Sequence, residues 1–169
     1  MCIRDSNRIA AEAVIDGIVT ENSALGLWGS VELLYARGLT EKLDAGVYLN
    51  TNSSIGIHNK FQLFKSDSYD MAVGIDAKTL LLSPANGWEV IPTFYYTKKY
   101  NDFDLILNPS LKFGPDFSGQ LGSNFLAPTL NSGIKFKSYP FRVGLSFSYL
   151  NITNNTFFVS LGGAYHFDF

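Results

Sequence analysis

A period-two alternation of apolar and polar residues, repeated in eight segments between residues 43 and 169, constrains this sequence more than any other feature. In every segment one of the two faces carries no Asp, Glu, Lys or Arg, and the other face carries the charges. Alternation of this kind predicts β-strands with one apolar face, because successive side chains of a strand point to opposite sides. The predicted strands are 43–50, 55–63, 69–77, 88–96, 103–113, 126–136, 141–149 and 157–169.

The charged face separates a membrane barrel from a soluble one. A soluble barrel would present a surface rich in Lys, Glu and Thr there, whereas this face holds isolated charges among small residues: Gly46, Gly56, Gly74, Gly133, Gly144 and Gly162. Small residues and opposite charges fit a crowded polar lumen. The other face fits contact with lipid, where a charge costs about 2–4 kcal/mol near the bilayer midplane. We therefore expect an all-β fold, a closed antiparallel transmembrane β-barrel, with a soluble lipocalin-like ligand-binding barrel as the alternative.

The number of strands depends on the residues before position 43. A further strand is expected at about 28–37, and bacterial single-chain barrels usually have an even number of strands. We therefore expect about 10, with the tenth either in the weakly patterned stretch 9–19 or upstream of the sequence. The expected division is a non-native leader at 1–6, an uncertain N-terminal segment or first strand at 7–27, and the barrel at 28–169. The opening MCIRDS resembles a translated sequencing-adapter fragment, so we expect a truncated N-terminus.

The connections between the predicted strands predict the orientation of the barrel. Short turns are expected on the periplasmic side at 65–68, 98–102 and 138–140, and longer loops on the outer side at 80–87 and 114–123. Three prolines fall inside predicted strands: Pro92, Pro109 and Pro128. Because proline cannot donate a ladder hydrogen bond, we expect these residues to mark bulges or the starts of strands.

Aromatic residues of the apolar face gather at the ends of the predicted strands, with aliphatic residues between them. This arrangement predicts the two aromatic girdles of a membrane barrel. The girdle residues are Tyr69, Tyr96, Phe103, Phe136, Phe141 and Phe169 at one end, and Trp88, Phe113, Tyr149 and Phe157 at the other.

The charged face predicts a network of side chains in the lumen. Its members are Asp44, His58, Lys60, Asp70, Asp76, Glu89, Asp104, Lys112, Lys135, Arg142, His166 and Asp168. We expect Asp44 to pair with Lys60 across one hairpin and His58 to face Asp76 across the next. The network is either a selectivity lining or a plug. We favour the plug, because the interior of a barrel of ~10 strands is small enough for side chains to nearly fill it.

The sequence gives little support for catalysis or for binding of a cofactor, metal or nucleic acid. Ser53 or Ser54 with His58 and Asp76 would supply the residue types of a hydrolase at the barrel rim, but we favour a hydrogen-bonded lumen histidine and expect no enzyme. Cys2 is the only cysteine, and no phosphate-binding glycine loop or metal-spaced histidine cluster is present. We expect no cofactor and no metal. The charges form no basic stripe, so we also expect no nucleic-acid partner.

Two stretches resemble known outer-membrane proteins. Ser160-x-Gly162-x-x-Tyr165-x-Phe167, followed by Phe169, resembles the C-terminal insertion signal of bacterial outer-membrane β-barrel proteins. Residues 35–46, YARGLTEKLDAG, resemble a strand-turn-strand segment of small, uncharacterised porin-like barrels of that class. The resemblance implies the outer membrane of a Gram-negative bacterium, with the lipid bilayer as environment and the barrel assembly machinery as a partner during insertion.

The function expected from these features is a structural or narrow porin-like role, with the lumen largely filled by the charged network. A passive diffusion channel for small solutes is one alternative. A closed barrel whose loop at 114–123 binds a surface partner and the rim hydrolase are the others.

Overall fold

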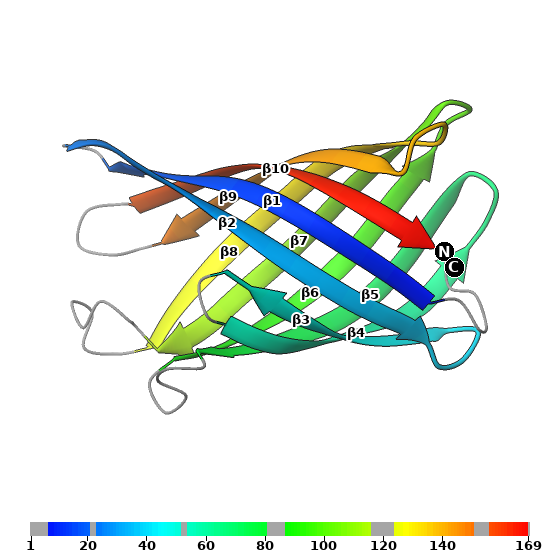
Figure 1. Ribbon diagram of the computed structural model, residues 1–169, viewed down its shortest axis with the longest axis horizontal. Coiled ribbons are helices and arrows are strands. Elements are labelled where there is room, and N and C mark those ends of the chain that lie inside the picture. Colours follow the sequence, from blue (N-terminus) through cyan, green and yellow to red (C-terminus); the bar gives the residue numbers. More distant parts are fainter. Residues whose placement is uncertain are drawn as a thin grey trace.

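The chain forms ten strands that close into an antiparallel barrel (Figure 1). The computed structural model describes residues 7–20, 23–51, 54–80, 87–115, 124–150 and 156–168. The strands are β1 (Asn7–Thr20), β2 (Ser23–Gly38), β3 (Leu43–Asn50), β4 (Ser54–Lys65), β5 (Tyr69–Leu80), β6 (Trp88–Lys99), β7 (Phe103–Pro115), β8 (Asn124–Phe136), β9 (Phe141–Leu150) and β10 (Thr156–Asp168). The expected closed ten-strand barrel is confirmed. The described part of the chain contains no helix long and apolar enough to cross a membrane.

The tenth strand is β1, which occupies the weakly patterned segment near the start of the sequence. It pairs with β10 without interruption from Arg8 opposite Asp168 to Val19 opposite Phe157. This seam joins the first strand to the last and places the start of β1 and the end of β10 at the same end of the barrel (Figure 1), called the terminal end below. The opposite end is the far end.

The connections differ between the two ends. At the terminal end they span 39–42, 66–68, 100–102 and 137–140, so each has three or four residues. At the far end they span 21–22, 51–53, 81–87, 116–123 and 151–155, and the two longest connections of the barrel are among them. This difference matches the expected one, with the terminal end as the side of short turns.

The outer face of the barrel is apolar along its middle. Aliphatic side chains such as Ile57, Leu130 and Leu161 are 55%, 44% and 51% exposed, although each lies inside a strand. Residues next to them in sequence, such as His58 and Thr129, are buried on the inner face. Exposed apolar surface on this scale around a closed wall is the exterior of a protein that sits in lipid.

Aromatic rings border this apolar band at both ends. At the terminal end Tyr69 lies 6.3 Å from Tyr96 between ring centroids, and Phe64 stacks on Tyr69 at 5.0 Å. At the far end Trp88 and Phe113 are 5.5 Å apart. Phe103, Phe136 and Phe141 also lie at the terminal end and Tyr149 at the far end, as expected, while the side chains of Phe157 and Phe169 lie outside the described residues.

The prediction that the three prolines mark bulges or strand starts was wrong. Pro92, Pro109 and Pro128 lie inside β6, β7 and β8, with their rings on the exposed outer face. The register shifts of the described strands are elsewhere, between Ile18 and Thr20 and between Gln62 and Phe64. The β6–β7 ladder pairs Val90 with Phe113 and Thr93 with Ser110, and becomes continuous only from Tyr96–Leu107 to Lys99–Asp104. Each proline lacks a backbone N–H, but its strand remains paired with its neighbours at other residues, so the missing hydrogen bond is tolerated.

The conclusion that the exterior of the barrel contacts lipid can be tested by introducing one charged side chain there. Leu130 is the middle residue of β8, and we expect Leu130→Arg to destabilise the folded barrel in lipid by about 2–4 kcal/mol, because the guanidinium would enter the hydrocarbon. Leu39→Arg is the matched control, since Leu39 is 58% exposed in the 39–42 connection. Urea unfolding in lipid vesicles measures both. Equal, small effects of the two substitutions would contradict a lipid-facing surface at Leu130.

Candidate functional site: the lumen

Charged side chains from neighbouring strands form a ring inside the barrel near the terminal end. Opposite charges face each other in register at four seams, and two further contacts extend the ring. The register pairs are Asp44–Lys60, Lys65–Asp70, Lys99–Asp104 and Asp104–Lys135, and the ion pairs are Asp70–Lys99 at 2.8 Å and Glu12–Arg142 at 2.9 Å. Cross-strand pairs of opposite charge stabilise a sheet. This charged ring therefore also favours the correct register of the strands that carry it.

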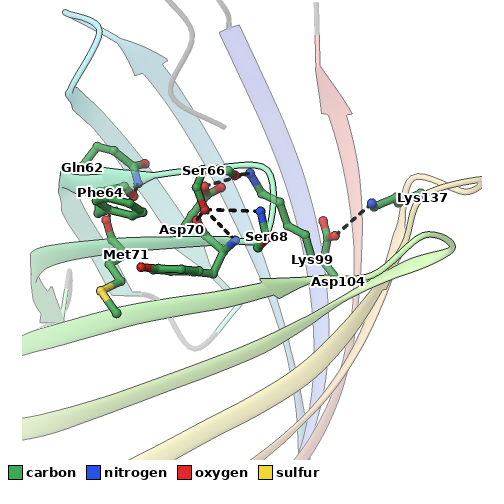
Figure 2. Close-up of polar contacts among 10 residues, drawn as sticks. Gln62, Phe64, Ser66, Ser68, Asp70, Met71, Lys99, Asp104 and Lys137 are labelled. Atoms are coloured by element: carbon green, nitrogen blue, oxygen red, sulfur yellow. Dashed lines mark hydrogen bonds and ion pairs between the residues drawn. The ribbon is translucent and has the colours of Figure 1, made fainter.

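The turn between β4 and β5 is fastened to this ring (Figure 2). The Lys99 ammonium donates to the Ser66 carbonyl at 2.7 Å and to Asp70 at 2.8 Å. Beside it, the amide of Gln62 donates to the carbonyls of Phe64 and Met71, the latter at 2.9 Å. Gln62 thus satisfies backbone acceptors at the β4 bulge, where the ladder itself is disrupted.

Two tyrosines fill one side of the lumen by lying over glycines of an adjacent strand. A Cβ added to Gly56 would stand 2.3 Å from the ring of Tyr48, and one added to Gly74 would stand 3.0 Å from the ring of Tyr95. Each ring also receives a lysine: Lys78 lies 4.7 Å from the centroid of Tyr48, and Lys60 lies 5.0 Å from that of Tyr95. Gly56 therefore makes room for the ring of Tyr48, whereas a Cβ at Gly74 would first meet the Asn59 carbonyl oxygen of the adjacent strand at 2.3 Å.

Two ion pairs join strands that are not neighbours. Lys78 on β5 reaches Glu32 on β2 at 3.1 Å, although β3 and β4 lie between these strands. Arg142 on β9 reaches Glu12 on β1 at 2.9 Å past β10. Such contacts extend over the lumen rather than along the wall, so they restrict the passage.

His58 and Asp76 form the pair that the alternation predicts. The residues are opposite each other on β4 and β5, and Nδ1 of His58 lies 2.6 Å from Oδ1 of Asp76. Ser54 is four residues from His58 on the same strand, which separates them by roughly 13 Å along it. A nucleophile must lie within hydrogen-bond reach of its base, so Ser54 does not complete a catalytic triad here, and Ser53 lies outside the described residues.

Two cavities occupy the lumen, of about 400 Å³ toward the far end and about 410 Å³ toward the terminal end. They share the lining residues Glu12, Glu32, Tyr95, Ile106, Asn108 and Arg142. Both ion pairs that reach over the lumen contribute to this shared level. The cavities therefore meet where the passage is most restricted by charge pairs.

The wall from β7 to β10 is lined by small polar residues and glycines instead of rings. Asn131, Ser146 and Ser160 line the far-end cavity together with Gly133, Gly144 and Gly162. Thr129 and Ser148, on the same wall, hydrogen-bond to each other at 2.8 Å. The two sides of the lumen therefore differ in lining: tyrosine rings lie on the side of β3–β6, and mostly small side chains, with Lys112 and Arg142, line the far-end cavity along β7–β10.

Several buried polar atoms have no hydrogen-bond partner within the described ranges. They are Tyr48 OH, His58 Nε2, Asp104 Oδ1, Asn108 Oδ1 and Ser110 Oγ. His58, Asp104, Asn108 and Ser110 line the two cavities. Because buried polar groups are rarely left without a hydrogen bond, these atoms require water in the cavities.

The predicted network residues are placed as follows. Asp44, His58, Lys60, Asp70, Asp76, Asp104, Lys112, Lys135 and Arg142 are buried or half-buried on the inner face, and Glu89 is half-buried opposite Lys78. The side chains of His166 and Asp168 lie outside the described residues.

Sequence reasoning missed Glu12, Glu32, Tyr48, Lys78 and Lys99. Glu12 lies in the weakly patterned stretch 9–19, Glu32 lies in the strand expected at about 28–37, whose faces were not assigned, and Lys78 and Lys99 lie just past the predicted ends of their strands. Continuing the alternation by a few residues would have found both lysines. Tyr48 is uncharged, so a search for charges passed over it.

No metal site is apparent in the described residues, where no three His, Cys, Asp or Glu side chains come together to hold an ion. The residues of the predicted insertion signal fall on β10. Tyr165 is exposed on the outer face, Gly162 lies opposite both Val14 and Gly144, and Ser160 is half-buried. Phe167 is paired with Ile9 through its backbone, and Phe169 lies outside the described residues.

Comparisons with known proteins show the fold. No family model and no curated protein matches the sequence. Among solved structures, the translocator domain of the autotransporter NalP from Neisseria meningitidis superposes with a TM-score of 0.50 at 12% identity, covering 98% of this chain and 90% of that domain. Neisserial surface protein A gives 0.49 at 12% identity over 95% of both chains, and the NanC porin 0.46 at 11% over 90% and 98%. The chain has the fold of bacterial outer-membrane β-barrels, and its exterior is that of a membrane-spanning one.

The contact between Tyr48 and Gly56 can be tested by one methyl group. We expect Gly56→Ala to destabilise the barrel by about 1–3 kcal/mol, because the new Cβ would overlap the buried ring and displace it. Gly29→Ala is the control, since a Cβ there would meet its nearest atom at 3.8 Å, an ordinary contact. The unfolding midpoint in urea measures both variants, and a stable Gly56→Ala protein would refute the packing of Tyr48 over this glycine.

Proposed function

We propose that this chain, a membrane-spanning barrel of the bacterial outer-membrane type, is a narrow porin-like protein whose water-filled lumen is narrowed at its middle by ion pairs. The observation that carries the proposal is the pair of lumen cavities lined by polar atoms without protein partners. Water in both cavities would form a path interrupted only at the level of Glu12, Glu32 and Arg142. A solid plug would leave no cavity on either side of that level.

The size of the interior supports passage of ions rather than large solutes. Barrels of ~8 strands are filled by their side chains, and wide aqueous channels occur at ~16 strands. A ten-strand barrel lies near the lower limit. The tyrosines over Gly56 and Gly74 narrow it further on one side, so we assign the path of ions to the side of β7–β10, where most lining side chains are small.

We place the terminal end in the periplasm and the far end outside, because short periplasmic turns and longer outer loops are the rule for such barrels. We also propose that the barrel assembly machinery recognises β10. This strand closes the barrel against β1, and its outward Tyr165 lies at the level of the terminal girdle. The lipid bilayer surrounds the apolar exterior.

Conductance across a planar bilayer tests the proposal. We expect the refolded wild type to give small, discrete current steps. The double variant Glu32→Gln/Lys78→Met should give larger steps, because both members of a pair that reaches over the lumen are removed together and neither charge is left buried alone. Heat-modifiable migration on a gel verifies that each protein is folded.

Glu41→Gln/Lys42→Met is the matched control, because it removes the same two charges from the exposed 39–42 connection. Its steps should equal those of the wild type. If folded wild type and the Glu32/Lys78 variant are both silent, the lumen is a plug, and the function should then be sought in the outer loops, first at 116–123.

A further inference from the structure

Within the described strands, like charges face each other at two seams of the lumen. At β1–β2, Glu12 is opposite Glu32, but each of these acids has its own base, Arg142 and Lys78. The other seam brings two bases together. Around the ring, acids and bases are opposed at β3–β4, β4–β5, β6–β7 and β7–β8. At β8–β9, however, Lys135 is directly opposite Arg142. Both side chains are half-buried and line the terminal-end cavity. Like charges directly opposite each other destabilise a sheet, so this seam lacks the stabilisation of the four seams at which acids oppose bases.

A third cation lies beside this pair. Lys137 is two residues after Lys135 and lines the same cavity. Its ammonium donates to the Tyr100 carbonyl and lies 3.7 Å from Oδ1 of Asp104, which is beyond hydrogen-bond distance (Figure 2). Asp104 is thus shared by two lysines of β8 and its end: Lys135 in register and Lys137 at ion-pair distance without a hydrogen bond.

The acids available at this seam do not balance the bases. Asp104 is in register with Lys99 on one side and with Lys135 on the other, and its Oδ1 is one of the buried atoms without a hydrogen bond. Glu12 accepts from one nitrogen of Arg142, Nη2 at 2.9 Å. Arginine has five N–H donors, so the guanidinium keeps capacity for a further acceptor. Among the described side chains here, three bases meet two acids, which leaves one positive charge in excess.

Space for an anion adjoins these cations. The terminal-end cavity of about 410 Å³ is lined by Lys135, Lys137 and Arg142, and a rim pocket of about 390 Å³ is lined by the two lysines and the 137–140 connection. His58, which is 8% exposed, also lines the cavity, and its Nε2 has no protein partner in the described part of the chain. The cations thus border a space that is accessible from the terminal rim.

We propose that the β8–β9 junction binds a phosphate group between Lys135, Lys137 and Arg142. Such an anion would accept charge-assisted hydrogen bonds from the lysines and from the free donors of Arg142, and would relieve the repulsion between Lys135 and Arg142. The phosphate comes either from free solute in the lumen or from a lipid headgroup at the rim. Binding is independent of whether the barrel conducts.

Thermal unfolding of the folded barrel in a non-ionic detergent, followed by heat-modifiable gel migration, tests the site. Inorganic phosphate is compared with chloride at equal ionic strength. In a second arm without free phosphate, the micelles contain phosphatidylglycerol. At about ten times the dissociation constant the wild type should unfold on the order of 3 °C higher with the phosphate group present. A shift in the first arm identifies free phosphate as a source, and a shift in the second arm alone identifies the headgroup.

Lys135→Gln should abolish this shift and, in chloride, should unfold at a higher temperature than the wild type, because the repulsion with Arg142 is gone. Lys137→Gln should also lose the shift. It replaces Lys135→Gln as the test if Lys135→Gln folds poorly. Lys112→Gln is the matched control in the far-end cavity and should keep the wild-type response. A wild type without a shift in both arms, or an equal shift in Lys135→Gln, would overturn the site.

Discussion

The closed hydrogen-bonded wall is the constraint on which the rest of the structure depends. Lipid offers no partner to backbone N–H and C=O groups, so every strand needs a neighbour on each side. The β1–β10 seam supplies the last of these neighbours, from Arg8–Asp168 to Val19–Phe157. Once the wall is closed, each side chain faces either lipid or the lumen, and the alternation of the strands decides which. The outward prolines are tolerated on this wall because each of their strands is still held by its other neighbours.

Closure also creates the electrostatic problem of the interior. Charges excluded from lipid on ten strands must share a small lumen, where an unpaired charge is costly. These charges are stabilised in two ways. Acids and bases lie in register around the charged ring, and the ion pairs Glu32–Lys78 and Glu12–Arg142 join strands that are not neighbours. Tyrosines over Gly56 and Gly74 pack the same side of the lumen. The opposite wall keeps small polar residues, and this asymmetry leaves the space that a narrow pore requires. At the β8–β9 seam two bases, Lys135 and Arg142, are in register, and this seam is where we propose that a phosphate group binds.

The parts of the site that could be predicted are those between strands joined by a short hairpin. His58 and Asp76 were placed opposite each other because the alternation and the turn at 66–68 fix the register of β4 and β5 to within one pair, and Asp44 and Lys60 follow by the same reasoning. Glu32 and Lys78 are 46 residues apart with two strands between them, so no local pattern brings them together. Their contact depends on the curvature of the wall, and the Lys78 ammonium also lies over the ring of Tyr48.

Sequence by itself determined that residues 43–169 form strands with one uncharged face, that this face fits lipid, and which charges of these predicted strands turn inward. The physical reason is local: successive side chains of a strand alternate, and lipid excludes charge from one side. Only the tertiary structure decided that β1 is the tenth strand, that rings line one side of the lumen and mostly small residues the other, and that like charges meet at β8–β9. These features depend on how ten strands curve and register against each other, and that geometry is set by closure of the whole sheet.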